Sequence, residues 1–311
     1  MLKIAAVKTG AIGDLIQTTP ALSALKHKHP ESEITLICGK EYAHVLKNHP
    51  AISCVRTFSS KRLYSPLMPL EAIRILILLR GFDKVYIFHT DPKWHFSGWL
   101  SEAKYSAKEV GVSRHLWHLK TVDAGNDFGY SFRPEAIICE LPGKPYVAIA
   151  AGGGRNERRH TPQKIWDKQA ELALKTVQET EYSVALLGTD EDRLCVSHPK
   201  IFDYTGKTTL SDCFHIINNA EHYIGCDSGL THLAACTGTP TTVLCGPTDP
   251  KETLPSNITD VIVSPLPCAP CERDGVPACG ENLCMRGISV TEVLGILQKK
   301  ALHVKTCRAY E

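Results

Sequence analysis

Residues 225–236 read GCDSGLTHLAAC, and the apolar run at 222–224 leads directly into them. The run predicts the end of a buried strand, residues 227–229 predict a tight turn, and the residues after the turn have helical spacing. A strand that feeds a glycine-containing turn and then a helix presents free backbone N–H groups and a positive dipole end to an anion. The stretch therefore predicts an anion-binding turn, beside which Thr231 and His232 can add hydrogen bonds.

A second stretch, GPTDP at residues 246–250, follows the apolar run Thr241–Cys245. In a parallel sheet this rigid loop is expected beside the turn at 227–229, because neighbouring strands end at the same edge. Two strand ends that converge on one crevice are where open α/β sheets bind ligands. Taken alone, the first stretch is equally consistent with an ordinary strand–loop–helix unit rich in small residues.

Together the two stretches resemble the C-terminal signature of the family 9 glycosyltransferases, the bacterial lipopolysaccharide heptosyltransferases. The resemblance implies an α/β fold of the GT-B type, in which two Rossmann-like domains face each other across a cleft. It implies an inverting glycosyltransferase that moves heptose from ADP-heptose to a sugar hydroxyl of the lipopolysaccharide inner core. The donor would contact Asp227, Ser228, Gly229, Thr231 and His232.

The length of 311 residues suits two domains. A hydrophobic content of 43% and a charged content of 22% are typical of a soluble globular protein, and a net charge of +2 gives no argument for a nucleic-acid partner. The chain shows no signal peptide at its N-terminus and no apolar window long enough to span a bilayer. These features predict a cytoplasmic protein.

Strand-like and helix-like segments alternate in both halves of the chain, which predicts βαβ units and parallel sheets. Proline and glycine at residues 141–145 predict a linker. We therefore expect an N-terminal acceptor-binding domain at 1–143 and a C-terminal nucleotide-sugar-binding domain at 144–290. The resemblance implies that the last helix, within 291–311, packs back on the first domain.

The pattern Gly10-x-x-Gly13-Asp14 lies between the first predicted strand and the first helix. Glycine permits a tight turn and a close approach of the backbone to a ligand. The third glycine of the dinucleotide fingerprint is missing, which disfavours a nicotinamide oxidoreductase. Position alone favours a helix N-cap for Asp14, whereas the family resemblance implies that Asp14 is the catalytic base.

Two further loops follow strands of the second domain. Residues 152–162 read GGGRNERRHTP, a composition that suits a diphosphate site as well as a flexible solvated loop. The resemblance implies that Arg159 contacts the diphosphate.

Residues 190–192 read DED. Acidic side chains at a strand end can accept hydrogen bonds from ribose hydroxyls, hold a divalent metal or remain solvated. The resemblance implies a ribose-binding acid here, which we assign to Glu191.

The chain contains 13 cysteines, and without a visible signal peptide their thiols are expected to be reduced. Four of them follow the last predicted strand, at Cys268, Cys271, Cys279 and Cys284. They could hold a structural zinc or iron ion, or remain unligated thiols. Some family members carry a similar cluster, and we expect that catalysis itself requires no cofactor.

Residues 66–80 are apolar and follow the basic residues Lys61 and Arg62. Such a segment suits a helix in peripheral contact with the inner membrane or a buried helix, and general packing favours the core. Other hypotheses for the whole chain stay open: transfer of another nucleotide sugar, transfer to a protein acceptor, or a non-catalytic nucleotide-sugar binding module. The intact Gly13-Asp14 pair argues against the binding module.

Overall fold

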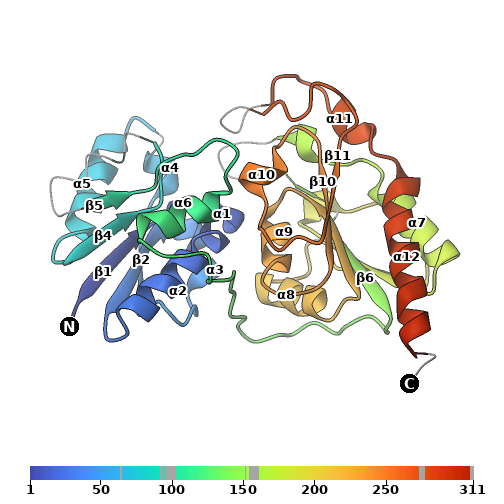
Figure 1. Cartoon of the computed structure of the whole chain (residues 1–311), viewed down its shortest axis with the longest axis horizontal. Helices are drawn as coiled ribbons and strands as arrows, with labels where there is room; N and C mark the ends of the chain where they lie inside the picture. Colours follow the sequence, from blue (N-terminus) through green and yellow to red (C-terminus); the bar gives the residue numbers. More distant parts are fainter. Residues whose placement is uncertain are drawn as a thin grey trace. The chain divides into compact units, whose positions relative to one another are not determined.

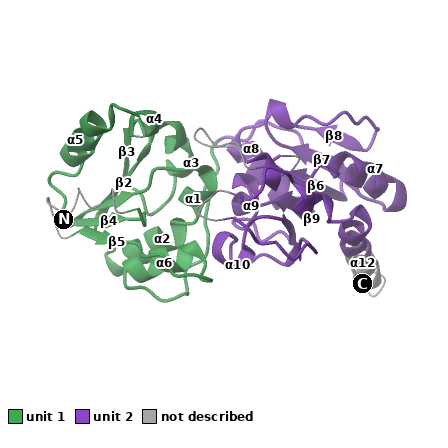
Figure 2. Ribbon diagram, turned by 90° about the horizontal axis from the view of Figure 1, so that it is seen from above, with its two compact units in different colours: residues 1–135 green, residues 136–311 purple. Residues whose placement is uncertain are grey.

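The computed structural model describes residues 1–63, 65–91, 94, 103–150, 152–153, 161–272 and 277–308, with the backbone alone at 300–308. The chain divides into two compact units, Met1–Glu135 and Ala136–Glu311 (Figure 2). Each unit is an α/β unit built on one parallel sheet.

The first unit has a five-stranded sheet in the order β3-β2-β1-β4-β5. Its central strand β1 is apolar, and Ala5 pairs with Thr35 on one side and with Val85 on the other. Helices α2 and α6 pack together on one face and α4 and α5 on the other (Figure 1). The strands are β1 (Lys3–Val7), β2 (Glu33–Gly39), β3 (Cys54–Phe58), β4 (Lys84–Ile87) and β5 (Ala103–Tyr105), and the helices are α1 (Ile12–Ile16), α2 (Thr19–Lys28), η1 (Lys40–Tyr42), α3 (Ala43–Leu46), α4 (Ser60–Leu63), α5 (Met68–Leu78) and α6 (Arg114–Thr121).

The second unit has a six-stranded sheet in the order β11-β10-β9-β6-β7-β8. Counted from β6, this is the 3-2-1-4-5-6 order of dinucleotide-binding folds, whose ligands bind where the strand order reverses, between β6 and β9. Apolar residues of α7 and α12 pack with residues of the sheet in one buried hydrophobic core. The strands are β6 (Tyr146–Ala150), β7 (Ser183–Leu187), β8 (Ile201–Asp203), β9 (His222–Cys226), β10 (Thr241–Cys245) and β11 (Asp260–Val263), and the helices are η3 (Pro162–Lys164), α7 (Gln169–Glu179), η4 (Asp190–Asp192), α8 (Leu210–Asn218), α9 (Gly229–Ala234), α10 (Pro250–Thr253), α11 (Leu283–Arg286) and α12 (Val290–Arg308).

The division between the units falls before the predicted linker at 141–145. The reason is a buried carboxylate: the N–H groups of Ile138 and Cys139 donate to Asp212 Oδ1, at 2.9 and 3.3 Å. Burial alone would raise the pKa of Asp212, but hydrogen bonds from Ile138 and Thr209 lower it to about 2. The segment after Glu135 is therefore fixed to the second unit.

Helix α12 belongs to the second unit. Val293, Leu294 and Leu297 are buried in its core, and Gln298 Nε2 donates to Glu179 Oε2 of α7 at 3.3 Å. The apolar face of α12 thus packs on α7, and the expectation that residues 291–311 pack on the first domain stays a prediction. Among the described residues, no helix combines the length and the apolar composition that a membrane span requires.

Three buried histidines make the stability of the first unit depend on pH. Burial lowers the pKa of His49 and of His115 to about 4, and that of His118 well below its usual value of 6.5. The unfolded chain therefore binds more protons below pH 6.5, so stability is complete above that value and is lost as pH falls towards 4. We expect the first unit to lose about 2 kcal/mol for each of His49 and His115 between pH 7 and pH 5. Urea unfolding followed by peptide-resolved amide exchange measures this loss, and His49→Gln should remove one histidine's share. An equal stability at both pH values would contradict it.

Candidate functional site

The predicted anion-binding turn lies at the carboxyl end of β9. Ser228 is the N-cap of α9 in extended conformation, and Gly229 begins the helix. A Cβ atom placed on Gly153, just after β6, would lie 3.7 Å from Ser228 Cβ. The loops after β6 and β9 therefore meet at the point where the strand order reverses. The predicted pairing of the two strands that end in the signature stretches, β9 and β10, is confirmed.

The side chain of Thr231 makes a hydrogen bond within the second unit. It is fully buried, and its Oγ1 donates to the carbonyl oxygen of Cys226 at 2.5 Å. The Tyr223 hydroxyl lies 3.2 Å from the same Oγ1 atom. The Thr231 hydroxyl thus joins α9 to β9, and the expected contact of Thr231 with the donor stays a prediction.

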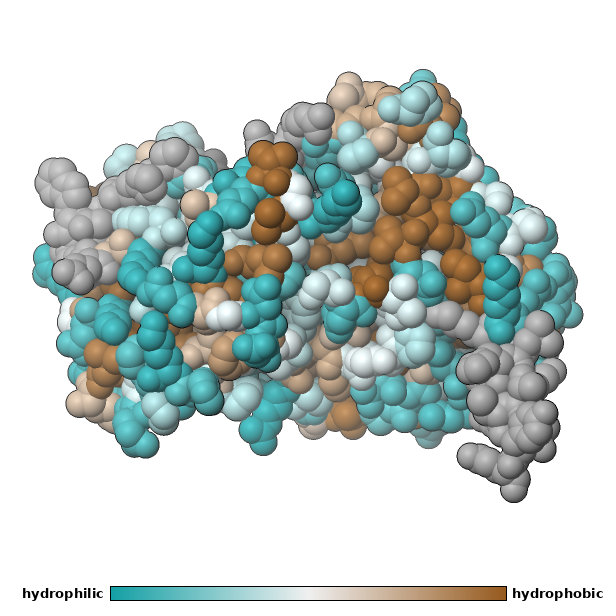
Figure 3. Space-filling model, viewed as in Figure 1, coloured by the Kyte–Doolittle hydropathy of each residue, from teal (hydrophilic) through white to brown (hydrophobic). Residues whose placement is uncertain are grey.

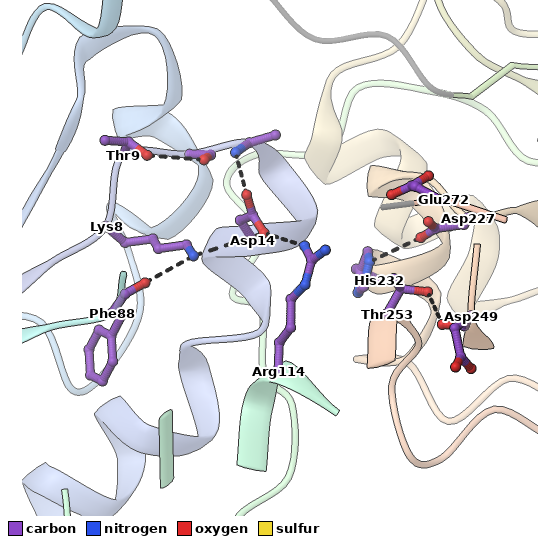
Figure 4. Close-up of polar contacts among 12 residues, drawn as sticks. Lys8, Thr9, Asp14, Phe88, Arg114, Asp227, His232, Asp249, Thr253 and Glu272 are labelled. Atoms are coloured by element: carbon purple, nitrogen blue, oxygen red, sulfur yellow. Dashed lines mark hydrogen bonds and ion pairs between the residues drawn. The ribbon is translucent and has the colours of Figure 1, made fainter. Parts of the chain in front are cut away.

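Asp227 lies in a nearly buried ionic network (Figure 4). Lys164 Nζ lies 3.2 Å from Asp227 Oδ2 and 2.8 Å from Glu272 Oε2, and His232 Nε2 lies 3.8 Å from Asp227 Oδ1. The side chains of Lys164, Asp227 and Glu272 are 15%, 10% and 7% exposed. Burial alone would lower the pKa of Lys164, but the two carboxylates raise it above its usual value. The lysine therefore bridges the two acids.

Sequence reasoning missed Lys164 and Glu272. Lys164 ends η3, and Glu272 directly follows Cys271 of the cysteine cluster. The N–H groups of Cys271 and Glu272 donate to the carbonyl oxygen of Pro247 at 3.0 and 2.8 Å. The loop that carries Glu272 is thereby attached to the GPTDP stretch. The sequence offers no local signal for the contact between Lys164 and Glu272, because the two residues are far apart along the chain.

The acidic triplet forms η4 after β7. Thr189 N and Oγ1 both donate to Asp192 Oδ2 at 2.8 Å, and Asp190 pairs with Arg193 at 3.0 Å. A Cβ atom on Gly152 would lie 2.1 Å from Asp192 Oδ1, so glycine is required where this loop meets the end of β6. Glu191 is exposed. Arg159 lies outside the described residues.

Asp14 is the third residue of α1 in the first unit. The N-cap is Ala11, so the cap expected from position alone is corrected: the Ala11 N–H donates to Asp14 Oδ2 at 3.3 Å. Arg114 Nη1 and Lys8 Nζ lie 3.2 and 3.9 Å from Asp14 Oδ1 (Figure 4). The side chain of Asp14 is 29% exposed, while Lys8 is buried and donates to the carbonyl oxygen of Phe88 at 3.0 Å. Two neighbouring cations favour an ionised carboxylate that is still accessible to a substrate proton.

Gly10 shapes the turn before α1. Its φ of +126° is a backbone conformation that favours glycine, and a Cβ atom there would lie 2.2 Å from the Tyr42 ring. Lys8 and Arg114 were not predicted from the sequence. Lys8 follows β1 by one residue, and Arg114 begins α6, a hundred residues from Asp14 along the chain.

The four cysteines do not form a metal site as they are placed. Cys268 and Cys279 are exposed, Cys271 is half-buried and Cys284 is buried, and all four thiols are free. Cys279 Sγ donates to the carbonyl oxygen of Glu281, and burial raises the pKa of Cys284. Within the described part of the chain, no three side chains of histidine, cysteine, aspartate or glutamate gather where they could hold a metal ion.

A family model described as glycosyltransferase family 9 (heptosyltransferase) matches residues 103–278, more than half of the chain. The chain belongs to this family. The expected enzyme class, a glycosyltransferase, is thereby confirmed. Lipopolysaccharide heptosyltransferase 3 of Escherichia coli is 22% identical over an alignment of 276 positions that covers 76% of this chain and 81% of that protein. Lipopolysaccharide heptosyltransferase 1 of Pseudomonas aeruginosa is 24% identical, over 87% of this chain and 86% of that protein.

Solved structures of the glycosyltransferase family 9 heptosyltransferases share the fold. The E. coli ADP-heptose lipopolysaccharide heptosyltransferase II has a TM-score of 0.73 at 17% identity and covers 98% of this chain and 100% of its own. The iron-containing dodecameric glycosyltransferase TibC of enterotoxigenic E. coli has a TM-score of 0.66 at 16% identity, over 97% of this chain and 76% of its own. The predicted GT-B fold class, with two parallel α/β sheets, is therefore confirmed.

Proposed function

We propose that this protein transfers heptose from ADP-heptose to a sugar hydroxyl of the lipopolysaccharide inner core, with inversion at the anomeric carbon. The observation that carries the proposal is the Asp14 carboxylate, accessible and paired with two cations, in a chain of the heptosyltransferase family. Support for the donor comes from relatives solved with ADP-2-deoxy-2-fluoro heptose and with ADP-D-beta-D-heptose.

The donor would bind to the second unit. In this proposal the turn formed by Asp227, Ser228 and Gly229 receives the diphosphate, with Arg159 as an added positive charge. Glu191 would accept hydrogen bonds from the ribose hydroxyls, because its exposed side chain leaves it accessible. Asp227 and His232 would contact the heptose side of the donor, and Lys164 fixes Asp227 for that contact.

Asp14 would act as the general base. As the acceptor oxygen attacks the anomeric carbon, its proton passes to Asp14, the bond between that carbon and the ADP oxygen breaks, and ADP leaves on the opposite face. General-base help typically contributes about 10²–10⁴-fold. Backbone N–H groups and arginine can stabilise the charge that develops on ADP.

The core acceptor carries a lipid, so we also propose a cytoplasmic enzyme in peripheral contact with the inner membrane.

A panel assay tests this function. Purified protein is incubated with ADP-heptose and other nucleotide sugars, and with core acceptors that are truncated one sugar at a time. The proposal predicts that ADP-heptose is consumed and that one truncated core gains a heptose. Transfer from another nucleotide sugar, or to a protein instead of a core sugar, would replace the substrate assignment. Binding without transfer on any acceptor would favour a non-catalytic module.

Chelation gives a separate prediction. Because the leaving group is stabilised by residues of the protein in this account, brief treatment with EDTA should leave the transfer rate within about twofold. The measurement is the initial rate of ADP release before and after chelation. A rapid and complete loss of activity that Mn²⁺ or Mg²⁺ restores would contradict this account of ADP departure.

A further inference from the structure

Helix α5 carries two apolar faces, and the core covers only one of them. Ile75 and Leu79 are fully or almost fully buried against the first sheet. The expectation that residues 66–80 form a core helix therefore explains only half of the segment. The other apolar side chains are exposed, and we call them the α5 patch: Leu67 47%, Met68 44%, Leu70 66%, Ile73 54% and Ile77 57%.

The α5 patch is continuous along the helix. Leu70, Ile73 and Ile77 are spaced by three and four residues, which places them on one helical face. Leu67, the N-cap, and Met68, the first residue of the helix, are also exposed. Scattered single apolar residues on a surface need no explanation, whereas a contiguous set of this kind marks an interaction site.

Between residues 60 and 80 the exposed charges are all positive. Lys61, Arg62, Arg74 and Arg80 are exposed. The single acid between residues 60 and 80 is Glu71, which is 2% exposed. Its Oε1 accepts the Ser59 N–H at 2.7 Å and lies 3.8 Å from Arg74 Nη1. The surface is therefore apolar with a cationic border.

We propose that the α5 patch docks on the surface of an anionic lipid bilayer. Large apolar side chains that enter the boundary between headgroups and acyl chains, with lysine and arginine at their border, are the features of an interfacial helix. A second copy of the chain fits less well, because a symmetric interface would bring the cationic borders of two patches together. The proposal rests on heptosyl transfer only for the identity of the lipid-linked acceptor, and docking itself needs no sugar.

A second exposed apolar set provides a comparison. Val261 and Val263 on β11 and Leu283 are 41%, 42% and 52% exposed, and Figure 3 shows hydrophobic residues gathered over β10 and β11. The strand β11 begins at Asp260 and has no run of cations like that of the α5 segment. Val263→Asp is therefore a matched control, since it places the same charge on an exposed apolar position of the other unit.

Vesicle flotation of the full chain tests the proposal. The probes are phosphatidylcholine vesicles with and without phosphatidylglycerol, and the variants are Ile73→Asp/Ile77→Asp, Lys61→Glu/Arg62→Glu and Val263→Asp. We expect binding that requires phosphatidylglycerol, weakens with salt, and falls at least about tenfold in both double variants but not in the control. The variants are expected to fold because the substituted side chains are exposed, and circular dichroism checks this.

Three results would overturn the docking proposal. They are no binding of the wild type to phosphatidylglycerol vesicles, equal binding by both double variants, and a wild-type dimer that Ile73→Asp/Ile77→Asp makes monomeric. The last result would assign the patch to a second copy of the chain. Transfer to a lipid-free core acceptor is measured in parallel, and its failure would count against the proposed function while leaving vesicle binding unaffected.

Discussion

Asp14→Asn is expected to lower kcat by at least about 10²-fold while the affinity for ADP-heptose changes little. The amide keeps the size of the side chain and an oxygen that can accept the Ala11 N–H, but it cannot take a proton from the acceptor hydroxyl. The donor contacts proposed here lie on the second unit, so the loss should fall on turnover. Steady-state rates at saturating substrates and calorimetric titration of the donor separate the two quantities.

Asp123→Asn is the matched control for this prediction. Asp123 also belongs to the first unit and pairs with Lys104, but the side chain is 61% exposed. Exposed pairs contribute little to stability, and asparagine tolerates the positive φ of 54° at this position. The control should keep the wild-type kcat. Near-normal turnover by Asp14→Asn would reduce Asp14 to a residue that stabilises the start of α1.

Lys164→Met should destabilise the second unit by about 3–5 kcal/mol, because it leaves Asp227 and Glu272 buried without their cation. It should also weaken ADP-heptose binding, since Asp227 is then no longer held in place. Adding Glu272→Gln to Lys164→Met should recover part of the lost stability, because it removes one of the two uncompensated charges. Urea unfolding of the single and double variants measures the coupling between the two residues.

Lys175→Met provides the comparison for Lys164. Lys175 pairs with Glu171 at 3.1 Å along α7, and both side chains are more than one-third exposed. An exposed pair at this spacing contributes about 0.3–0.5 kcal/mol. If Lys164→Met lowered the free energy of unfolding no more than this control does, the buried network would not organise the turn at residues 227–229.

Local patterns predicted much of the second unit. The apolar runs ending at Cys226 and Cys245 became paired strands, because runs of this kind fill buried parallel strands. Asp227 and His232 could be predicted as neighbours, since both belong to one strand–turn–helix unit. Lys164 could not, because its partners Asp227 and Glu272 are brought to it by the tertiary fold alone.

The parts that could not be predicted have the same physical origin. The sequence shows that α5 and α12 carry apolar faces, but not which surface each face meets. For α12 that surface is α7, through Val293 and Leu297. For α5 one apolar face meets the sheet and the other stays exposed, and periodicity does not distinguish them. Cysteine spacing likewise does not determine whether four thiols come together.

The anomeric configuration of the transferred sugar tests the central claim most directly. Wild-type protein is supplied with ADP-heptose and the core acceptor that it accepts, and the new glycosidic bond is assigned by NMR. A single displacement with Asp14 as base predicts a configuration opposite to that of the donor. Retention of the donor configuration would contradict the account, because it requires two displacements or a different geometry of attack.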